Sequence, residues 1–528
     1  MMRLFTVTLI GAFLLSACGS GSINPALATL TAATPSVPSI SRNTTFYVDR
    51  NNGSDSYPGS KAKPWQSIQK CLNKVQPGDT CEIRGGTYNE ALVFKNSGTN
   101  TARITIRNSN NEIVTIDSGN EKTLVTTGRI HFYTIEGLRF IADYPSTGQG
   151  DATIDLSANI WDGETTKDGG NNGFIFKDCY IEGAILFYGH DNLVENCELN
   201  GKGNWTNGLY DRFASSYDNT YRGNKIYDYT IRGIWTMQGT ENITIEKNTV
   251  FDIGEIGIDC DGAWIPVNHC IVRNNKVYNV TGEGVGILLE NAFDAVVEGN
   301  TIYNIVLGIS TINYGINNPD SSYYVSSAEY REKNTNTVIR NNIIYFAGSD
   351  GILCKASPGG KALNNTIYET KQLNGYWAAI GLARYGNYYC HSWEIKNNII
   401  SQPEKYAIWY EGPHDGLDNL SVDYNLFDFN SSEPKFFWVE HTEESDTWYE
   451  YTLTQIQDQM QLERHSIIGN PLFVDANNSN FQLQANSPAI DIGFNLGNLN
   501  PYDINGSVRP QGAGYEIGAY EYSSDSLE

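Results

Sequence analysis

Aliphatic residues recur along this chain in a short phrase that repeats ten times between residues 176 and 425. Each copy contains an aliphatic or aromatic residue, two mostly polar residues, and then Asn or Cys, which we call the ladder residue. Most steps between ladder residues are 18 to 27 residues long, and the longer steps to residues 342 and 398 must contain loops. A fixed period of this size is typical of one supersecondary unit stacked on copies of itself. The ladder residues are Cys179, Cys197, Asn224, Asn248, Asn275, Asn300, Asn342, Asn365, Asn398 and Asn425.

The repeated unit is expected to consist of strands and turns. Val, Ile and Tyr flank the ladder residues, and Gly or Asn separates the short runs, which favours strands over helices. An Asn side chain can be buried if its amide bonds the same amide in the coils above and below, with Cys as a small apolar filler. A loop-rich or glycosylated protein would not return in phase with aliphatic residues. The pattern therefore predicts a parallel β-helix, which is an all-β solenoid.

Two segments at helical spacing interrupt the strand pattern. A capping helix is predicted over residues 64–75, and a second helix over residues 453–464, before the final strands. A cap is needed because the open end of a coil is an exposed sheet edge. The spacing of the first helix comes from Trp65, Ile68, Leu72 and Val75.

Motifs at both ends of the repeats carry a resemblance to a known family. Residues 46–90 contain Gly53-Ser-Asp55, Pro64-Trp65, Pro77-Gly-Asp79 and Gly85-Gly-Thr-Tyr88. The other end contains Asn470-Pro-Leu-Phe473, Ser487-Pro-Ala-Ile-Asp491 and Gly518-Ala-Tyr-Glu521. Together they resemble the right-handed parallel β-helix proteins of the pectate-lyase-like superfamily. The resemblance covers nearly all of the chain after residue 43, and it implies a fold more than a substrate.

The N-terminus has the features of an export signal. Residues 1–17 combine a basic start with an apolar run too short to span a bilayer. The sequence Leu15-Ser-Ala-Cys18 resembles the bacterial lipobox, which implies acylation of Cys18 and an exported lipoprotein held on the outer membrane or cell surface by its lipid. Residues 18–42, rich in Ser, Ala, Thr and Pro, predict a flexible tether. Residues 43–528 are expected to form one β-helix domain and a monomer, because a solenoid grows in one dimension.

Export also permits disulfides. Cys71 with Cys81 is the first expected pair, and Cys260 with Cys270 is the second. Cys179 and Cys197 lie on adjacent rungs and could either bond or remain reduced.

The charge of the chain limits its partners. It has 36 basic and 60 acidic residues, a formal net charge of −24, and no basic run. Nucleic acid is therefore not expected as a partner. A polyanionic sugar would also be repelled unless cations or local Arg and Lys residues intervene.

A second strand in each coil usually starts with Gly-Ile or Gly-Leu, and its alternation predicts which side chains face outward. The inward residues, such as Thr236, Cys260 and Leu289, are small or apolar, as this register requires. We call the predicted outward residues the outward stripe. They are Tyr210 and Arg212, Trp235 and Met237, Asp259 and Asp261, Leu288 and Glu290, Ser310 and Ile312, Leu353 and Lys355, Ala383 and Tyr385, and Trp409 and Glu411.

Asp259, Asp261 and Glu290 are expected to meet on adjacent coils of this stripe. Coils stack about 4.8 Å apart and alternate residues on a strand lie about 6.5 Å apart, so the three carboxylates can converge. The alternative is a group of solvated surface acids, but three grouped like charges require a cation or a shared proton. An acidic centre in an aromatic-lined groove is typical of a polysaccharide site. The surrounding candidates are Arg212, Lys355 and Arg384, the possible sugar-stacking rings of Tyr210, Trp235, Tyr385 and Trp409, Glu411 on the same stripe as a further substrate-binding residue, and His414 at the rim.

Two reactions fit these residues. In a uronate lyase, Asp259, Asp261 and Glu290 could hold Ca²⁺, and Lys355 or Arg212 would remove the proton, which resembles the Ca²⁺-dependent pectate, alginate and chondroitin lyases of this fold. In a glycoside hydrolase the acids themselves act, Asp261 and Glu290 at the close spacing of retaining enzymes, or Asp259 and Asp261 at the wider inverting spacing. The sequence favours a lyase on a uronate-containing polysaccharide. A glycoside hydrolase and a non-catalytic glycan-binding or adhesive lipoprotein are the alternatives.

Overall fold

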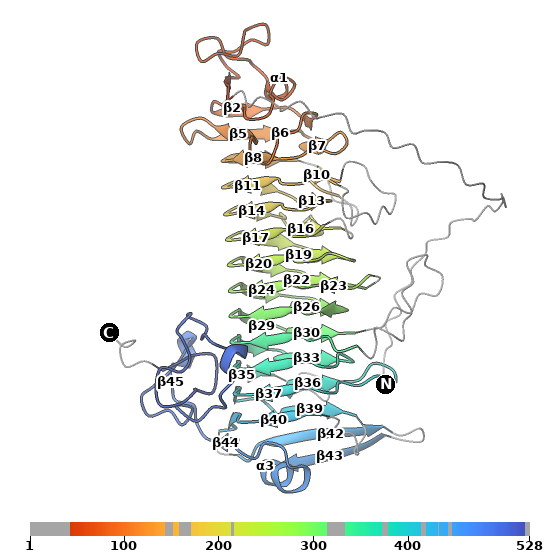
Figure 1. Ribbon diagram of the computed structural model, residues 1–528, viewed down its shortest axis with the longest axis vertical. Helices are drawn as coiled ribbons and strands as arrows, with labels where there is room; N and C mark the ends of the chain where they lie inside the picture. The colour runs from red at the N-terminus through yellow and green to blue at the C-terminus, as the bar shows by residue number, and fades with distance from the viewer. Residues whose placement is uncertain are drawn as a thin grey trace, which may run out of the picture. The chain divides into compact units, whose positions relative to one another are not determined.

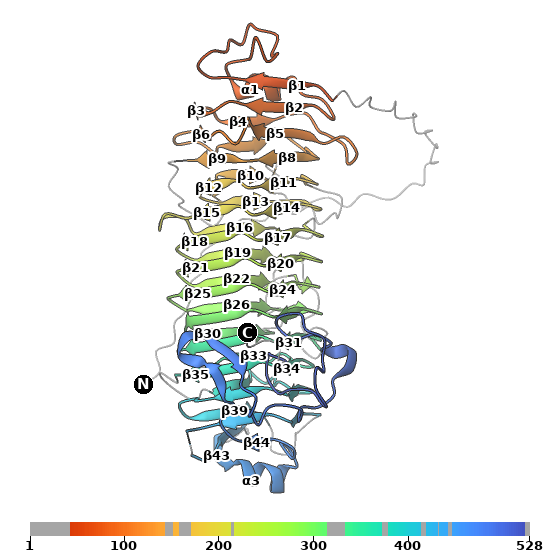
Figure 2. The ribbon, with the colours of Figure 1, turned by 90° about the vertical axis from the view of Figure 1, so that its left-hand side faces the viewer.

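Stacked coils, each crossing three sheets, make up the protein in the computed structural model (Figure 1; Figure 2). The structure describes residues 43–142, 151–157, 170–212, 216–263, 265–313, 333–371, 378–412, 419–430, 432–441 and 446–522. Within them, each long sheet has 14 strands, and neighbouring strands of a sheet come from successive coils. Every pairing in these sheets is parallel except β42 with β43. The predicted all-β parallel β-helix is therefore confirmed.

Sheet I precedes the ladder residue of each coil, sheet II follows it, and sheet III completes the coil. Sheet I contains β1 (Thr45–Val48), β2 (Thr80–Ile83), β5 (Ile104–Asn108), β8 (Tyr133–Glu136), β11 (Ile175–Lys177), β14 (Leu193–Glu195), β17 (Thr220–Arg222), β20 (Thr244–Glu246), β24 (Ile271–Arg273), β28 (Val296–Glu298), β31 (Val338–Arg340), β34 (Lys361–Leu363), β37 (Glu394–Lys396) and β40 (Ser421–Asp423). Sheet II contains β3 (Gly86–Tyr88), β6 (Val114–Asp117), β9 (Leu138–Ile141), β12 (Tyr180–Glu182), β15 (Glu198–Asn200), β18 (Lys225–Tyr229), β21 (Thr249–Ile253), β25 (Lys276–Val280), β29 (Thr301–Ile305), β32 (Ile343–Ala347), β35 (Thr366–Thr370), β38 (Ile399–Ser401), β41 (Leu426–Asp428) and β44 (Ile467–Ile468). Sheet III contains β4 (Leu92–Phe94), β7 (Leu124–Thr126), β10 (Ile154–Leu156), β13 (Ile185–Phe187), β16 (Asn207–Asp211), β19 (Arg232–Met237), β22 (Ile256–Asp261), β26 (Val285–Glu290), β30 (Leu307–Ile312), β33 (Ile352–Lys355), β36 (Ala378–Ala383), β39 (Tyr406–Glu411), β42 (Lys435–His441) and β43 (Asp446–Thr452).

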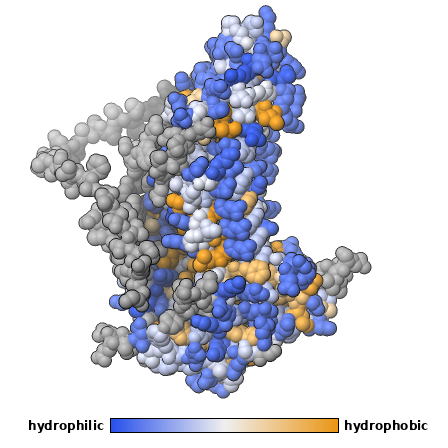
Figure 3. Space-filling model, turned by 180° about the vertical axis from the view of Figure 1, so that it is seen from behind, coloured by the Kyte–Doolittle hydropathy of each residue, from blue (hydrophilic) through white to orange (hydrophobic). Residues whose placement is uncertain are grey.

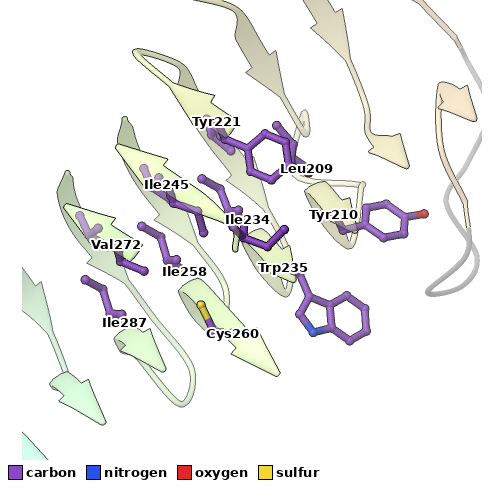
Figure 4. Packing of buried hydrophobic residues seen from close by; sticks show 14 of the residues in the cluster. Leu209, Tyr210, Tyr221, Ile234, Trp235, Ile245, Ile258, Cys260, Val272 and Ile287 are labelled. Carbon is purple, nitrogen blue, oxygen red and sulfur yellow. The ribbon is translucent and has the colours of Figure 1, made fainter. Parts of the chain in front are cut away.

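The interior of the coils is filled by inward-facing aliphatic side chains of all three sheets. Ile234, Ile258 and Ile287 from successive strands of sheet III face Tyr221, Ile245 and Val272 from sheet I (Figure 4). Each of these six residues is fully buried. Burial of such a side chain contributes about 1.5–3 kcal/mol, so the stacked aliphatic rows supply the main driving force for the coil.

Hydrogen bonds between ladder residues connect the coils from inside, as the sequence predicts. The Asn300 side-chain oxygen accepts from the backbone N–H of Asn275 at 2.9 Å and from its amide nitrogen at 3.0 Å. The Asn300 amide nitrogen donates to the oxygen of Asn342 at 2.9 Å and to the carbonyl of Val272 at 2.9 Å. The same pattern runs through the ladder from Asn224 to Asn425. Each buried amide is therefore satisfied by its neighbours.

Different groups occupy the two ends of the ladder. At the N-terminal end, the Cys179 N–H donates to Cys197 Sγ at 3.4 Å and the Cys197 N–H to Asn224 Oδ1 at 2.9 Å. At the C-terminal end, the Asn425 amide donates to the buried carboxyl of Glu463 at 3.0 and 3.2 Å. The ladder is thus closed by a carboxyl group that has little contact with water.

The residue before several ladder residues has a separate role. Asn341, Asn364 and Asn397 adopt the left-handed conformation, with φ of 55°, 51° and 58°, which Asn tolerates better than most residues. Their amides face outward and donate to the C-terminal segment, at 2.8 Å to Asn500 Oδ1, 2.9 Å to the carbonyl of Glu516 and 2.9 Å to that of residue 494. In each of these Asn-Asn pairs, the second amide therefore bonds to the ladder inside the coils, and the first bonds to the C-terminal segment.

The capping elements are shorter than predicted. Helix α1 spans Ile68–Leu72, because Ser67 is extended at its N-terminal cap and Trp65 forms a bridge with Val48. The second predicted helix is α3 (Leu453–Gln455) followed by the π-helix η1 (Ile456–Met460). No helix among the described residues is long and apolar enough to cross a membrane. The remaining elements are the short pair β23 (Val267–Asn268) and β27 (Ala292–Phe293), the antiparallel pair β45 (Phe473–Asp475) and β46 (Asn480–Leu483), and the 3₁₀ helices η2 (Ala476–Asn478) and η3 (Gly497–Leu499).

Both expected disulfides are present. Cys71 bonds Cys81 and ties α1 to β2, and Cys260 bonds Cys270. Within the described residues, four cysteines are free and buried, including the ladder residues Cys179 and Cys197. The ladder cysteines are therefore reduced, one of the two outcomes that the sequence left open.

The outer surfaces of sheets I and II are regular. The outer column of sheet I alternates in charge through Glu195, Arg222, Glu246, Arg273, Glu298 and Arg340, with ion pairs of 2.5 to 2.7 Å. Sheet II carries stacked rings of Tyr227, Phe251, Tyr278, Tyr303 and Tyr345, 4.8 to 5.0 Å apart. Figure 3 shows that hydrophilic residues cover most of the face it presents, with apolar patches among them. Sheet III lacks such a repeat along its described outer columns, which makes it the face where a site is expected.

We predict that Asn300→Ala lowers the free energy of unfolding by about 3 kcal/mol or more, because it leaves two buried donors of Asn275 without acceptors. Chemical denaturation would measure the change. Asn89→Ala, at an exposed position, is the control and should change stability by less than about 0.5 kcal/mol. Equal effects of the two substitutions would contradict the importance of the amide ladder.

A second prediction concerns the end of the ladder. Burial raises the pKa of Glu463 to about 8, against hydrogen bonds from Ser466 and Asn425 that lower it. The folded protein therefore keeps a proton that the unfolded chain loses near pH 4.5, and the stability contributed by this proton is lost as pH rises from about 4.5 to about 8. Glu463→Gln should reduce the fall in melting temperature between pH 5 and pH 9 relative to the wild type, whereas exposed Glu433→Gln should leave that fall unchanged.

Candidate active site

The strands of sheet III place the predicted acids on adjacent coils. Along one outer column, Trp235 is in register with Asp259, which is in register with Leu288. Along the next column, Asp261 is in register with Glu290. Ser310 and Leu353 continue the first column, and Ile312 and Lys355 the second. The predicted outward stripe is therefore confirmed as far as Lys355.

The next coil differs from the prediction. Gly381 and Ala383 occupy the two columns, not Ala383 and Tyr385. Gly381-Leu382 was interpreted as the start of the strand, but β36 begins with Ala378, and Gly381 lies in the first column itself. A Cβ on Gly381 would come 2.0 Å from Nε1 of Trp409, which explains the glycine. Tyr385 follows the strand and is exposed.

Most members of the stripe are buried, although solvated side chains were expected. Asp259 is 0% exposed and Asp261 6%, and Tyr210, Trp235 and Trp409 are also buried. Figure 4 shows Tyr210 and Trp235 on the side of their strands opposite Leu209 and Ile234, and their rings stack at 6.3 Å. Large side chains along the columns therefore pack on one another instead of presenting open faces to solvent.

Four residues form the acid cluster, which we define as Asp259, Asp261, Glu290 and Arg232. Arg232 Nε lies 2.6 Å from Asp259 Oδ2. Asp261 accepts hydrogen bonds from Trp235 Nε1 at 3.1 Å and from the backbone N–H of Ala263 at 2.8 Å. Glu290 is partly exposed and is in register with Asp261 on the adjacent coil. Two acids of adjacent coils thus lie side by side in one outer column.

Electrostatics decide where the protons of this cluster reside. Burial raises the pKa of Asp259 to about 7, although the charge of Arg232 opposes the shift. Burial and the charges of Asp259 and Asp261 raise the pKa of Glu290 to about 9. Near neutral pH, Glu290 therefore keeps its proton.

Arg232 was not predicted as a site residue. Its guanidinium lies 4.3 Å from the ring centroid of Trp235 and contacts Asp259, so it links two predicted residues. The inward–outward alternation predicted for each strand starts at its glycine, and Arg232 precedes that glycine. A charged residue at this position is a signal in the sequence, because the following coils have Ile256, Val285 and Leu307 in the same register.

The acid cluster does not fit the Ca²⁺ site that was expected for Asp259, Asp261 and Glu290. Where the chain is described, no group of three His, Cys, Asp or Glu side chains could hold a metal ion. Arg232 already compensates the charge of Asp259, and Trp235 and Ala263 both donate to the carboxyl of Asp261. These carboxyls are paired with neighbouring groups where a metal site requires free carboxylate oxygens.

The other predicted residues lie at either end of the stripe. Lys355 Nζ is 5.4 Å from the ring centroid of Tyr385, and burial lowers the pKa of Lys355 against the charge of Glu411. Glu411 accepts the N–H of Arg384 at 2.9 Å. Arg212 lies two coils to the other side of Asp261, and burial lowers its pKa. His414 and Cys18 lie outside the described residues.

Trp409 contacts an acid that the sequence did not indicate. Its indole donates to Oδ1 of Asp350 at 3.1 Å, as does the backbone N–H of Ala378. Burial raises the pKa of Asp350 to about 7. Between this contact and the acid cluster the outer columns contain Lys355 and a group of uncharged residues, which we call the neutral floor: Leu288, Ser310, Ile312 and Leu353.

Several solved structures have a similar fold. The crystal structure of pectate lyase Pel9A is 15% identical, covers 91% of this chain and 96% of its own, and has a TM-score of 0.43. The complex of XylC with xylose is 12% identical, covers 91% and 98%, and has a TM-score of 0.49. The PL6 family alginate lyase AlyGC is 17% identical, covers 78% and 56%, and has a TM-score of 0.49.

Sequence comparisons agree on the architecture. The uncharacterized protein YwoF of Bacillus subtilis (strain 168) is 25% identical over 464 residues, which cover 83% of this chain and 90% of that protein. The model "Pel9A-like, right handed beta helix region" matches residues 46–264, and "Right handed beta helix region" matches residues 267–442. With three parallel sheets running through both regions, the chain belongs to the right-handed parallel β-helix proteins.

Proposed function

We propose that this protein is a polysaccharide-degrading enzyme that hydrolyses glycosidic bonds, with Glu290 as the general acid and Asp261 as the nucleophile. One observation carries the proposal: Asp261 and Glu290 are in register on adjacent coils, beside the buried Arg232–Asp259 ion pair. Glycosidases require one protonated and one ionised carboxyl on either side of the scissile bond. Burial and the neighbouring acids raise the pKa of Glu290 to about 9, which suits it to the protonated role.

The surroundings of each carboxyl fit its role. Glu290 is partly exposed and can donate its proton to the leaving oxygen of a sugar that binds over it. Asp261 accepts hydrogen bonds from Trp235 and from the backbone of Ala263, which hold its carboxyl in place on the adjacent coil. Adjacent coils lie about 4.8 Å apart, so the two carboxyls suit the roughly 5 Å of retaining enzymes better than the wider inverting distance.

Electrostatics favour a substrate that is neutral near the cleaved bond. Arg232 is already paired with Asp259, so its charge is not available to a uronate. Lys355 lies two coils, or about 10 Å, from Glu290, at the far end of the neutral floor. A uronate bound over Glu290 would therefore lie beside the acids, with Lys355 two coils away.

A second candidate is β-elimination on a uronate-containing polysaccharide, the reaction that the sequence favoured. Burial lowers the pKa of Lys355, which makes its amine a better base near neutral pH. This lysine lies two coils from Glu290 and beside the exposed ring of Tyr385. In that reaction Lys355 would be essential and the acid pair would not act as acid and nucleophile.

The N-terminus supports a proposal on location. The lipobox-like sequence ending in Cys18 would anchor the protein by a lipid on the outer membrane or cell surface, with residues 18–42 as a tether. The two disulfides suit an exported protein, because thiols are kept reduced in the cytosol.

We expect Glu290→Gln and Asp261→Asn to lower kcat by about 10²- to 10⁴-fold, because each removes one of the two carboxyl roles. Reducing ends released from neutral and uronate polysaccharides would measure the rate. Glu283→Gln changes an exposed glutamate on the loop before β26 and should retain activity.

The same assay separates the candidates. Unsaturated uronate ends, detected by their ultraviolet absorbance and lost in Lys355→Ala, would overturn hydrolysis in favour of elimination. Glycan binding by a wild type that releases no ends would favour the non-catalytic binding protein.

The pH profile provides a further prediction. Because Glu290 must be protonated, kcat/KM should fall as pH rises through its raised pKa of about 9. Asp259→Asn removes a negative charge that raises this pKa, so the alkaline limb should move to lower pH. The exposed Asp252→Asn is the control and should leave the limb in place. An alkaline limb that is unchanged in Asp259→Asn would exclude Glu290 as the acid.

A further inference from the structure

The Cys260–Cys270 disulfide lies directly under the acid pair, and we infer that it is a positioning element that holds Asp261 against Glu290. The inference rests on the proposed function. Cys260 stands between Asp259 and Asp261 in β22 and is fully buried, with its side chain on the inner side of the strand. Its partner Cys270 immediately precedes β24, the sheet I strand of the next coil.

The turn closed by this disulfide is longer than its neighbours. Cys260 and Cys270 are 10 residues apart. The equivalent residues of the preceding coil, Thr236 and Ile243, are seven apart, and those of the following coil, Leu289 and Ala295, are six apart. A longer turn has more conformational freedom, and here it begins at the acid that must be held in place.

This turn also contacts the strand that carries Glu290. The Gly262 N–H donates to the carbonyl of Glu290 at 2.8 Å, and the Asn291 amide donates to the carbonyl of Gly262 at 3.1 Å. The Ala263 N–H donates to the carboxylate of Asp261 itself at 2.8 Å. Displacement of residues 262–263 would therefore change both the orientation of Asp261 and its position relative to Glu290.

A covalent link is used at the coil that carries two of the acids. In the neighbouring coils, buried pairs Thr236 with Ile243 and Leu289 with Ala295 occupy the equivalent positions without a bond. The cysteine coil carries both Asp259 and Asp261, and Glu290 is in register with Asp261 on the next coil. The disulfide restricts the backbone of this strand between the two aspartates, and with it the position of Asp261.

The capping disulfide offers a matched control. Cys71 and Cys81 are also 10 residues apart, so the two bridges restrict the unfolded chain by the same loop length. They differ in place, because Cys71–Cys81 ties α1 to β2 at the cap, many coils from the acid cluster. A purely structural role would make their removal equivalent.

The test compares Cys260→Ala/Cys270→Ala with Cys71→Ala/Cys81→Ala in the full chain, well below the melting temperature of either. We expect kcat to fall at least about tenfold in the first variant with KM changed less than about twofold, and kcat of the second to stay within about twofold of the wild type. Cys260→Val/Cys270→Ala fills the interior better and should reproduce the loss of kcat if the alanine pair folds poorly.

Hydrogen exchange provides a readout independent of activity. Amide exchange at residues 262–263 should accelerate at least about tenfold in the Cys260 variants and remain unchanged in the cap variant. Unchanged exchange at this turn, or an equal loss of kcat in both variants, would overturn the positioning role. A wild type that hydrolyses no glycan while the turn still loosens on removal of Cys260–Cys270 would reject the proposed function and retain the mechanical role of the disulfide.

Discussion

The hydrogen-bonded ladder of buried asparagines is the constraint on which the rest of this protein depends. A coil can stack on the next in several registers if only aliphatic side chains meet, because apolar contacts have no direction. An amide that must find its partner above and below permits one register, since any other would leave buried donors and acceptors unsatisfied. Register in turn decides which residues form columns on the outer faces, and so the acid cluster depends on the ladder that lies inside the same coils.

The outer faces of the three sheets differ in how regularly their residues repeat from coil to coil. Sheet I alternates charge along its column and sheet II stacks rings, so each coil stabilises the next through the same contact. The outer columns of sheet III change from aromatic to acidic to apolar over successive coils. Contacts between equivalent residues of successive coils therefore stabilise this face less than the other two. Its residues are less constrained by stacking and are free to serve a reaction.

Within the acid cluster, the roles of the carboxyls come from their environments. Asp259 is neutralised by Arg232, and Asp261 is held by two hydrogen bonds. Glu290 alone faces out, and both burial and its neighbours keep it protonated. The three acids therefore have different roles: Asp259 is part of an ion pair, Asp261 is held in place by hydrogen bonds, and Glu290 is the proton donor. The disulfide beneath them belongs to the same arrangement, because a strand that carries two buried acids needs a firm backbone.

The sequence by itself determined the repeat, the ladder, both disulfides and the adjacency of Asp259, Asp261 and Glu290, because strand alternation and coil stacking are strictly periodic. A periodic pattern could not locate the residues that depart from it. Gly381 was assigned to the wrong position because Trp409 folds across it, and Arg232 was missed because it reaches Asp259 from a position before the counted strand. Burial of the stripe, the raised pKa of Glu290 and the pairing of Arg232 with Asp259 were decided by the tertiary structure alone. Each depends on side chains from different coils packing together, and a linear pattern contains no such distances.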